Sequence, residues 1–249
     1  MQTDRLSLLG DAADAVATAL RTQRDWGMSG GRDGQYALDL TADDAALAVL
    51  RRAGVGVLSE ESGLEDHGTG EIVIIDPVDG STNCSRGIPW YATSLCLVDR
   101  DGPAVALVVN QASGTRYWAE RGGGAFCDGV PLHPSACSTI SDAIVGLNGL
   151  PPANLGYAQS RVLGAIALDL CLVAAGVLDG YIDCIHDAHG VWDYAGGALI
   201  CAEAGAVVVD AWDRELYAMT HHARRTPVAA ASAGLLGPML AARRTMGRA

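Results

Sequence analysis

Apolar residues recur at helical spacing at the start of the chain. Over residues 4–24 they fall three and four positions apart, which predicts an amphipathic helix, and the positions are Leu6, Leu9, Ala13, Val16, Ala17 and Leu20. After a glycine-rich stretch, a second helix is expected to begin near Thr41 as its N-cap, with Asp43 in the first turn, and to end at Gly54. The N-terminal part of the chain therefore predicts two helices.

Short runs of apolar residues mark the expected strands. The run IVII at 72–75 is wholly apolar, as is typical of a strand covered on both faces of its sheet. Further strands are expected at 55–58, 92–98, 104–110, 114–120, 143–147, 206–209 and 227–231. Helical patterns cover 160–175, 192–205 and the end of the chain from about 232. Turn residues at 148–156 predict a division into two domains, 1–147 and 148–249.

Two carboxylates follow the apolar strand at 72–75. Asp76 and Asp79 are three positions apart and would face opposite sides of an uninterrupted strand. Pro77 is expected to break the strand, so that a tight turn brings both carboxylates and the Val78 carbonyl round one point. Hard oxygen ligands of this kind suit Mg²⁺. The same residue types also suit a turn without a metal.

Neighbouring positions favour the metal interpretation. Gly80 allows close backbone approach, and Ser81 and Thr82 can begin a helix whose free N–H groups would hold a phosphate. Glu60 follows an expected strand, and Asp193 lies in the first turn of an expected helix. An acid at a helix start is commonly only a cap. Acids at the ends of several regular elements, however, lie where α/β proteins build their sites.

Composition and charge narrow the function classes. The 249 residues are 49% hydrophobic, enough for a full core, and the net charge is −12 without a basic cluster, so we expect no nucleic-acid partner. Neither a run of 18 apolar residues nor a signal peptide is visible, so we expect no membrane partner. Seven cysteines without Cys-x-x-Cys spacing indicate neither a disulfide framework nor a zinc site, and a reducing cytoplasm is expected.

All seventeen basic side chains are arginines, and the chain contains no lysine. Mechanisms that require a lysine are therefore excluded. These include Schiff-base and pyridoxal chemistry, the P-loop nucleotide site and the protein-kinase strand lysine.

Several motifs together carry a resemblance to a known family. They are SEE at 59–61, DPVDGSTN at 76–83, GGGAFCDG at 122–129, AIALDLCLVAAGVLDGYID at 165–183 and WDYAG at 192–196. In order and approximate spacing they resemble the motifs of the inositol monophosphatase family of Mg²⁺-dependent, lithium-sensitive phosphatases. The resemblance implies a mixed α+β and α/β fold, a five-layered α/β/α/β/α sandwich of the inositol monophosphatase/fructose-1,6-bisphosphatase type. It also implies a homodimer.

The resemblance further implies roles for individual residues. Two or three Mg²⁺ ions would be bound by Glu60, Asp76, the Val78 carbonyl, Asp79 and Asp193. The attacking water would be oriented and deprotonated by Glu60 and Ser81, with Asp43 behind Ser81. The phosphate would be held by Gly80, Ser81 and Thr82, and the hydroxyl groups of the substrate by Asp183. On this view the first domain carries most metal ligands, and the second supplies Asp193 and substrate contacts.

The chain departs from the family pattern where the alcohol half of the substrate would bind. The segment 184–191 is a few residues longer than in typical inositol phosphatases, and it carries His186 and His189. These histidines either belong to a polar surface loop, the interpretation we favour, or contact the substrate or a metal. A family loop of the form Lys-x-Asp-Gly has Arg32-Asp33-Gly34 as its nearest match.

Two other functions fit the sequence poorly. A haloacid-dehalogenase-type phosphatase has one residue between its aspartates, where this chain has two, and it needs a catalytic basic residue that is normally a lysine. An EF-hand needs a different spacing of acids between two helices, whereas here a strand precedes the loop. A catalytically inactive metal-binding scaffold on the same fold is a third possibility. Among enzymes, the substrates considered are myo-inositol 1-phosphate, histidinol phosphate, fructose 1,6-bisphosphate and 3′-phosphoadenosine 5′-phosphate. A monophosphate is favoured, with inositol phosphate first, because we identify no arginine cluster for a second phosphate.

Overall fold

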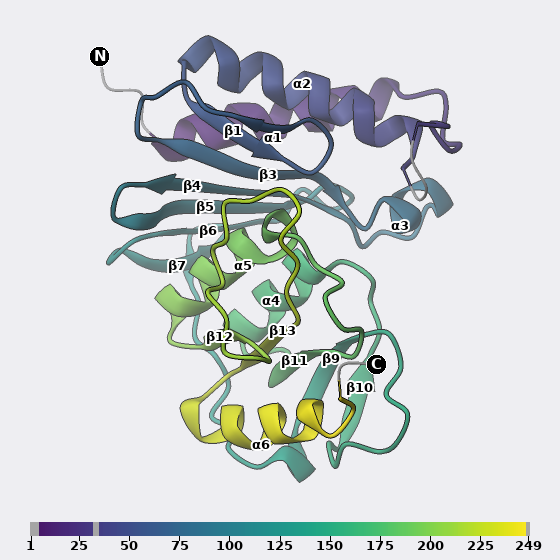
Figure 1. Ribbon diagram of the computed structural model, residues 1–249, viewed down its shortest axis with the longest axis vertical. Helices are drawn as coiled ribbons and strands as arrows, with labels where there is room; N and C mark the ends of the chain where they lie inside the picture. Colours follow the sequence, from purple (N-terminus) through teal and green to yellow (C-terminus); the bar gives the residue numbers. More distant parts are fainter. Residues whose placement is uncertain (1–4, 32–34, 248–249) are drawn as a thin grey trace.

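The helices and sheets stack in five layers, in the order helix, sheet, helix, sheet, helix (Figure 1). The structure, a computed structural model, describes residues 5–31 and 35–247. The outer helices α1 (Arg5–Thr22) and α2 (Ala37–Ala53) form the first layer, and α6 (Ala233–Arg244) forms the last. The expected sandwich is confirmed.

The first sheet has eight strands in the described residues, in the order β2-β1-β3-β4-β5-β6-β7-β8. Their bounds are β1 (Gly56–Ser59), β2 (Gly63–Glu65), β3 (Ile72–Asp79), β4 (Ala92–Asp99), β5 (Gly102–Asn110), β6 (Arg116–Glu120), β7 (Gly124–Cys127) and β8 (Val130–Pro131). All neighbours are antiparallel except β1 and β3, which run parallel. A short helix, α3 (Ser81–Arg86), follows β3.

The second sheet has five strands in the described residues, in the order β10-β9-β11-β13-β12. Their bounds are β9 (Ile144–Asn148), β10 (Gln159–Arg161), β11 (Gly180–Asp183), β12 (Val207–Asp210) and β13 (Pro227–Ala230), and the 3₁₀ turn η1 (Ile140–Asp142) precedes β9. Because β9 pairs with β10 and β11, it belongs with the second sheet. A domain boundary at 147/148 stays a prediction, and sheet membership alone would place it between β8 and β9.

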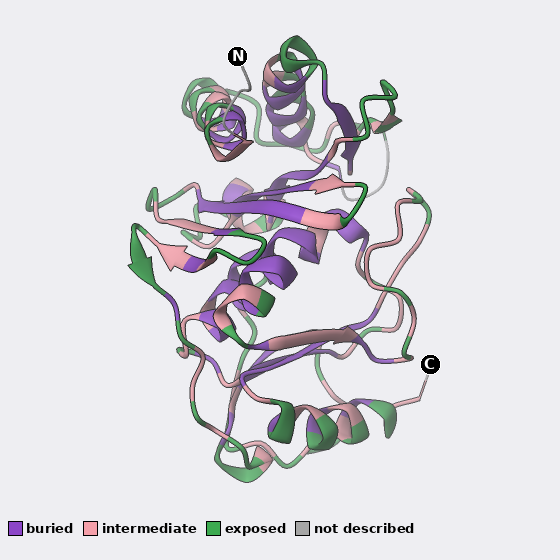
Figure 2. Ribbon diagram, turned by 90° about the vertical axis from the view of Figure 1, so that its left-hand side faces the viewer, coloured by how far each residue is buried: buried purple, intermediate pink, exposed green. Residues whose placement is uncertain are grey.

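Two helices fill the layer between the sheets. They are α4 (Ile166–Ala174) and α5 (Val191–Ala204), and most of their residues are buried. The largest core cluster joins side chains of the first sheet, both helices and the second sheet, as the buried middle of Figure 2 shows. Their almost continuous apolar sequence follows from this, since a helix between two sheets has no solvent face.

The second helix does not begin where the sequence suggested. We expected Thr41 as its N-cap, but α2 begins at Ala37 with Tyr36 as the N-cap, and the Thr41 hydroxyl donates to the carbonyl of Ala37 inside the helix. The Tyr36 N–H donates to the carboxylate of Asp39, 2.8 Å away. Asp39 therefore takes the first-turn position that we had given to Asp43.

Two further observations concern the chain as a whole. Each of the seven cysteines is a free thiol. Of the helices that the structure describes, none has the length and apolar character needed to cross a membrane.

Candidate active site

The apolar strand β3 extends further than the sequence predicted. Pro77 does not end it; the strand continues to Asp79 through a β-bulge against β4. The bulge is held by two bonds: the Thr93 hydroxyl donates to the Pro77 carbonyl at 2.8 Å, and the Val78 N–H donates to Asp76 Oδ1 at 2.9 Å. A bulge inserts extra residues on one strand and re-aims its side chains. It is therefore this bulge that governs how the Asp76 and Asp79 side chains are aimed.

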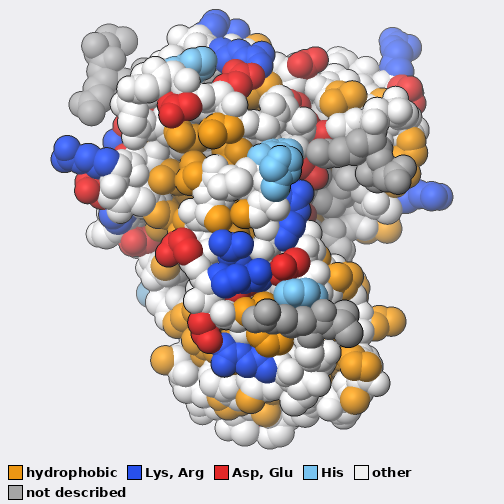
Figure 3. Space-filling model, viewed as in Figure 1, with side chains coloured by type: hydrophobic (Ala, Val, Ile, Leu, Met, Phe, Trp, Pro, Cys, Tyr) orange, Lys and Arg blue, Asp and Glu red, His pale blue; other side chains and the backbone are white. Residues whose placement is uncertain are grey.

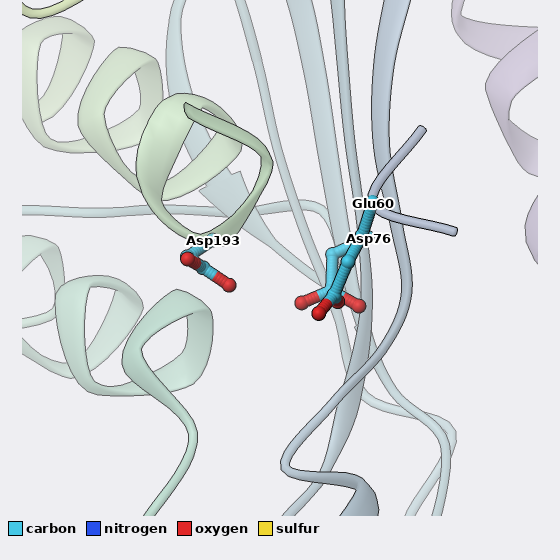
Figure 4. Close-up of side chains that lie close together, drawn as sticks. All are labelled: Glu60, Asp76 and Asp193. Atoms are coloured by element: carbon cyan, nitrogen blue, oxygen red, sulfur yellow. The ribbon is translucent and has the colours of Figure 1, made fainter. Parts of the chain in front are cut away.

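Glu60 reaches the same place from the neighbouring strand. Ser59 and Ile75 are paired in the parallel ladder of β1 and β3, so the next residue of each strand, Glu60 and Asp76, end side by side. The Glu60 N–H donates to the Ile75 carbonyl at 3.2 Å and continues the ladder. In Figure 4 the carboxylates of Glu60 and Asp76 point to one spot.

Asp193 approaches that spot from the middle helix layer. It is the third residue of α5, and its Oδ2 accepts a hydrogen bond from the Gly190 N–H at 2.6 Å. Asp193 therefore caps the helix, as the simpler interpretation of the sequence expected. Its side chain also faces Glu60 and Asp76 across the gap between the layers (Figure 4).

These three carboxylates form a candidate metal centre. One oxygen from each of Glu60, Asp76 and Asp193 lies within 4.8 Å of the other two. Burial raises the pKa of Asp76 well above its usual value, and the charges of Glu60 and Asp79 raise it further. Carboxylates gathered at one point, here one buried and two partly buried, repel each other unless a cation is bound. The donor set is all oxygen, so it fits Mg²⁺ or another hard divalent cation.

Asp79 lies beside this centre and also contacts the middle layer. Its Oδ2 accepts a hydrogen bond from the Ala167 N–H in the first turn of α4, at 2.7 Å. Burial and the charge of Asp193 raise its pKa well above the usual value. Asp79 does not belong to the group of three carboxylates whose oxygens lie within 4.8 Å of one another. Asp79 and the Val78 carbonyl therefore stay predicted metal ligands.

Gly80 begins the helix that follows β3, and its backbone requires glycine. It is the N-cap of α3, with φ of +85°. A Cβ there would lie 3.0 Å from the Gly164 carbonyl oxygen and 3.1 Å from that of Trp90. Ser81 is the first residue of α3, and the Thr82 hydroxyl lies 3.2 Å from the hydroxyl of Tyr36. The three predicted phosphate-binding residues are thus consecutive at one helix start.

Asp43 does not lie in the first turn of its helix, as expected, but in the interior of α2. Its Oδ1 accepts a hydrogen bond from the Ser59 hydroxyl at 2.6 Å, and its role behind Ser81 stays a prediction. Burial raises its pKa. Asp39, which the sequence reasoning missed, contributes to the raised pKa of Asp76. The signal for Asp39 would have been its position three residues after Tyr36.

A cavity of about 90 Å³ adjoins the carboxylates. It is lined by Asp79, Leu147, Asn148, Val162, Gly164, Ala165, Ile166, Asp169, Tyr181 and His189. Asp169 is fully buried and accepts a hydrogen bond from the Trp90 indole N–H at 3.0 Å; burial raises its pKa to about 7. Apart from Asp79 and His189, none of the polar lining residues was singled out from the sequence.

The two histidines of the 184–191 segment have different surroundings. His186 accepts a hydrogen bond from the Trp212 indole N–H at 3.2 Å and does not line the cavity. His189 lines it and is only 14% exposed, so the surface-loop interpretation is wrong for His189. Burial alone would lower the pKa of His189, but the carboxylates of Asp193, Asp183 and Asp79 raise it to about 9.

The segment between β12 and β13 reaches the centre from the second sheet (Figure 1). A ring nitrogen of His221 lies 3.0 Å from the Glu60 carbonyl oxygen, and the Arg224 guanidinium lies 4.9 Å from the centre of the Trp192 ring. Histidine and arginine side chains gather on this face in Figure 3. The loop thus ties the second sheet to the strand end that carries Glu60. The nearest match to the family's lysine loop, Arg32–Gly34, lies outside the described residues.

Comparison with known proteins shows the family to which the chain belongs. The profile of the inositol monophosphatase family matches residues 7–245. The chain belongs to this family. A relative from Mesorhizobium japonicum, an inositol-1-monophosphatase, is 35% identical over 234 residues, covering 83% of this chain and 86% of the relative. A fructose-1,6-bisphosphatase/inositol-1-monophosphatase from Methanothermobacter thermautotrophicus is 32% identical over 217 residues, covering 78% and 77%.

Solved structures agree on the fold. An inositol monophosphatase–fructose 1,6-bisphosphatase superposes with a TM-score of 0.84 at 25% identity, covering 96% of this chain and 100% of that one. The protein is therefore a phosphatase, a phosphoric monoester hydrolase of the inositol monophosphatase family. The relatives are named as monophosphatases or as bisphosphatases, so family membership leaves the substrate open.

Proposed function

We propose that this phosphatase hydrolyses the phosphate monoester of a small polyol, with myo-inositol 1-phosphate as the first candidate. The observation that carries the proposal is the carboxylate centre of Glu60, Asp76 and Asp193 beside a cavity with hydrogen-bonding walls. The carboxylate centre would bind the metal ions and the phosphate, and the cavity would bind the alcohol.

Two or three Mg²⁺ ions would be held by Glu60, Asp76, Val78, Asp79 and Asp193. When bound, divalent cations lower the pKa of a water molecule and neutralise the charge that develops on the leaving oxygen. Glu60 would accept the proton of the attacking water, and the Ser81 hydroxyl would orient that water. The start of α3, at Gly80, Ser81 and Thr82, would hold the phosphate through backbone N–H groups. Asp43 would support Glu60 and Ser81 indirectly, through its hydrogen bond with the Ser59 hydroxyl.

The cavity lining favours a monophosphate. Two carboxylates, Asp79 and Asp169, line it, and no arginine does so among the described residues. A second phosphate on the alcohol would meet these two carboxylates, with His189 as the one basic side chain among the described lining residues, and this disfavours fructose 1,6-bisphosphate and 3′-phosphoadenosine 5′-phosphate. The same acidic lining favours histidinol phosphate as the second candidate, because its ammonium group carries positive charge.

Phosphate release from these four esters, with and without Mg²⁺, tests the proposal. We expect Mg²⁺-dependent release with a monophosphate preferred, and loss of that release in Asp193→Asn but not in the exposed control Asp101→Asn. Binding of Mg²⁺ without release from any ester would instead support a non-catalytic scaffold. Preferred release from a bisphosphate would contradict the substrate assignment.

Three further expectations accompany this proposal. We propose that the protein is a homodimer, which sedimentation analysis would measure. We propose a cytoplasmic location, consistent with its free thiols. Inhibition of phosphate release by lithium is expected if a third, weaker metal position exists near Glu60.

A further inference from the structure

The segment between β11 and α5, residues 184–190, brings His189 to the cavity. The strand β11 ends at Asp183, and α5 begins at Val191. The carboxylate of Asp183, our predicted contact for the substrate hydroxyls, is fully buried and does not line the cavity. His189 lines the cavity instead. His189 therefore lies at the cavity wall, and Asp183 lies behind it.

The imidazole of His189 is surrounded by polar groups. Its Nε2 lies 3.2 Å from Asn148 Nδ2, 3.3 Å from the Tyr181 hydroxyl and 3.7 Å from Asp183 Oδ2. Its Nδ1 lies 3.4 Å from Asp193 Oδ2. Asp183 Oδ1 accepts hydrogen bonds from Asn148 and from the Ile185 N–H, both at 3.0 Å, whereas Oδ2 is buried without a hydrogen-bond partner among the described residues. The polar groups of Asn148, Tyr181 and Asp183 thus converge on one ring.

The segment that carries His189 is fixed by contacts with the loop between β12 and β13. Asp187 receives two hydrogen bonds from the Arg214 guanidinium, at 2.6 and 3.2 Å, and its N–H donates to the Thr226 hydroxyl at 2.9 Å. His189 itself forms an isolated antiparallel bridge with Arg225, with backbone bonds of 2.8 and 3.2 Å. Because both Asp187 and His189 are bonded to this loop, the ring is held at the cavity wall.

We propose that His189 selects the alcohol half of the substrate, and that Asp183 acts by holding the imidazole rather than by touching the substrate. The inference rests on the proposed function, since it concerns the alcohol of the same phosphate ester. His189, Asn148 and Tyr181 form one hydrogen-bonding wall. Other lining residues, Val162 and Ile166 among them, are apolar. Such a cavity suits an alcohol with hydroxyl groups on one side and C–H groups on the other.

The test compares a polyol ester with an ester that has no hydroxyl to offer. The ratio of kcat/KM for myo-inositol 1-phosphate to kcat/KM for ethyl phosphate measures recognition of the alcohol. We expect His189→Ala to lower this ratio about tenfold, the scale of a lost hydrogen bond, mainly through KM for the polyol ester. Because kcat/KM for ethyl phosphate is measured in the same variant, a loss common to both esters, such as one transmitted through Asp193, leaves the ratio unchanged. His186→Gln, on the same segment but away from the cavity, serves as the control and should keep the native ratio.

A double-mutant cycle separates the two residues. Asp183→Asn alone should lower the ratio, but in the His189→Ala background it should lower it no further. An undiminished effect of Asp183→Asn in that background would show direct contact of Asp183 with the substrate and overturn the proposal. A native ratio in His189→Ala would overturn it as well. Thermal melting of each variant verifies that it is folded.

A readout independent of turnover completes the test. In ¹⁵N-histidine-labelled protein with Mg²⁺, phosphate and myo-inositol, we expect the ring signal that His189→Ala removes to shift, and the His186 signal to stay. If the native protein releases no phosphate from any ester, the proposed function fails. If the native protein releases phosphate, but His189→Ala keeps the native ratio and myo-inositol does not shift the His189 ring signal, only the present inference fails.

Discussion

Asp76 shows how a residue can serve function at the expense of stability. It is almost fully buried, and both burial and the neighbouring Glu60 and Asp79 raise its pKa well above the usual value. In a core position an apolar residue would pack without this cost. The carboxylate therefore makes physical sense only with a cation beside it.

We predict opposite effects of Asp76→Asn on stability and activity. Without metal, the amide removes one of several buried like charges, so the variant should melt a few degrees higher than the native protein in EDTA. With Mg²⁺, phosphate release should fall by more than about a hundredfold, beyond the loss typical of changes outside the ligands. Melting curves with and without Mg²⁺ measure both. The exposed Asp101→Asn should change neither; equal melting of native and Asp76→Asn protein in EDTA would contradict the argument.

The sequence predicts some residues of the site and not others, for physical reasons. Glu60, Asp76 and Asp193 were predicted because each follows or begins a regular element, and the ends of neighbouring elements meet. Asp39 was missed because the start of its helix depends on the Tyr36 cap, which the apolar period does not show. The role of Asn148 at the cavity was missed because it depends on the pairing of β9 with β11, which local sequence does not encode.

At the scale of elements, the segment 184–190 is positioned by Arg214. This guanidinium bonds both Asp187 of the segment and Asp210, whose carboxylate is fully buried. It lowers the pKa of Asp187 below its usual value, which indicates a favourable pair. The segment is thus fixed by a contact with the end of β12 rather than by its own local structure.

We predict that Arg214→Gln loosens this segment. The variant leaves Asp210 without its guanidinium, and we expect a loss of about 1–3 kcal/mol in the free energy of unfolding. KM for the polyol ester should rise several-fold with kcat for ethyl phosphate little changed, because His189 loses its fixed position. Arg121→Gln, which removes a half-exposed pair with Asp99, is the matched control. Unchanged KM in Arg214→Gln would show that the segment holds its shape without this contact.

Element types were predictable where periodicity is strong, and the irregular features were not. Strands β1 and β3–β6, the helix α5 and the terminal helix lie close to their predicted ranges. The helix predicted over 160–175 begins only at Ile166, because residues 159–161 form β10, and neither β10 nor β2 was predicted. The bulge at Asp76–Asp79 was predicted as a break, because proline ordinarily removes a ladder bond. Its cost is offset by the Thr93 hydroxyl, a contact from the neighbouring strand that only the folded sheet provides.

At the scale of the whole molecule, the carboxylate centre links stability to pH and metal. The raised pKa values of Asp76 and Asp79 mean that, above the usual 3.8, the folded protein holds protons that the unfolded chain has released. Stability of the metal-free protein must then fall as pH rises from about 4 through the raised values. Asp169 adds to this fall up to about pH 7.

We predict that Mg²⁺ stabilises the protein more at pH 7.5 than at pH 5.5. At the lower pH, protons compete for the buried carboxylates and already neutralise part of their charge. At the higher pH the ion replaces those protons, so the rise in melting temperature on adding Mg²⁺ should be larger. Calorimetry at both pH values, in EDTA and in saturating Mg²⁺, measures the difference. A rise that is the same at both pH values would contradict this linkage.

The layered arrangement has one more consequence, since the candidate ligands come from two layers. Glu60 and Asp76 end strands of the first sheet, whereas Asp193 begins a helix of the middle layer. Between them in sequence, residues 149–158 are mostly exposed. A chain divided there would leave each fragment with an incomplete set of ligands. Phosphate release from the two fragments together would then report their association, which makes this site a natural basis for a split-enzyme sensor.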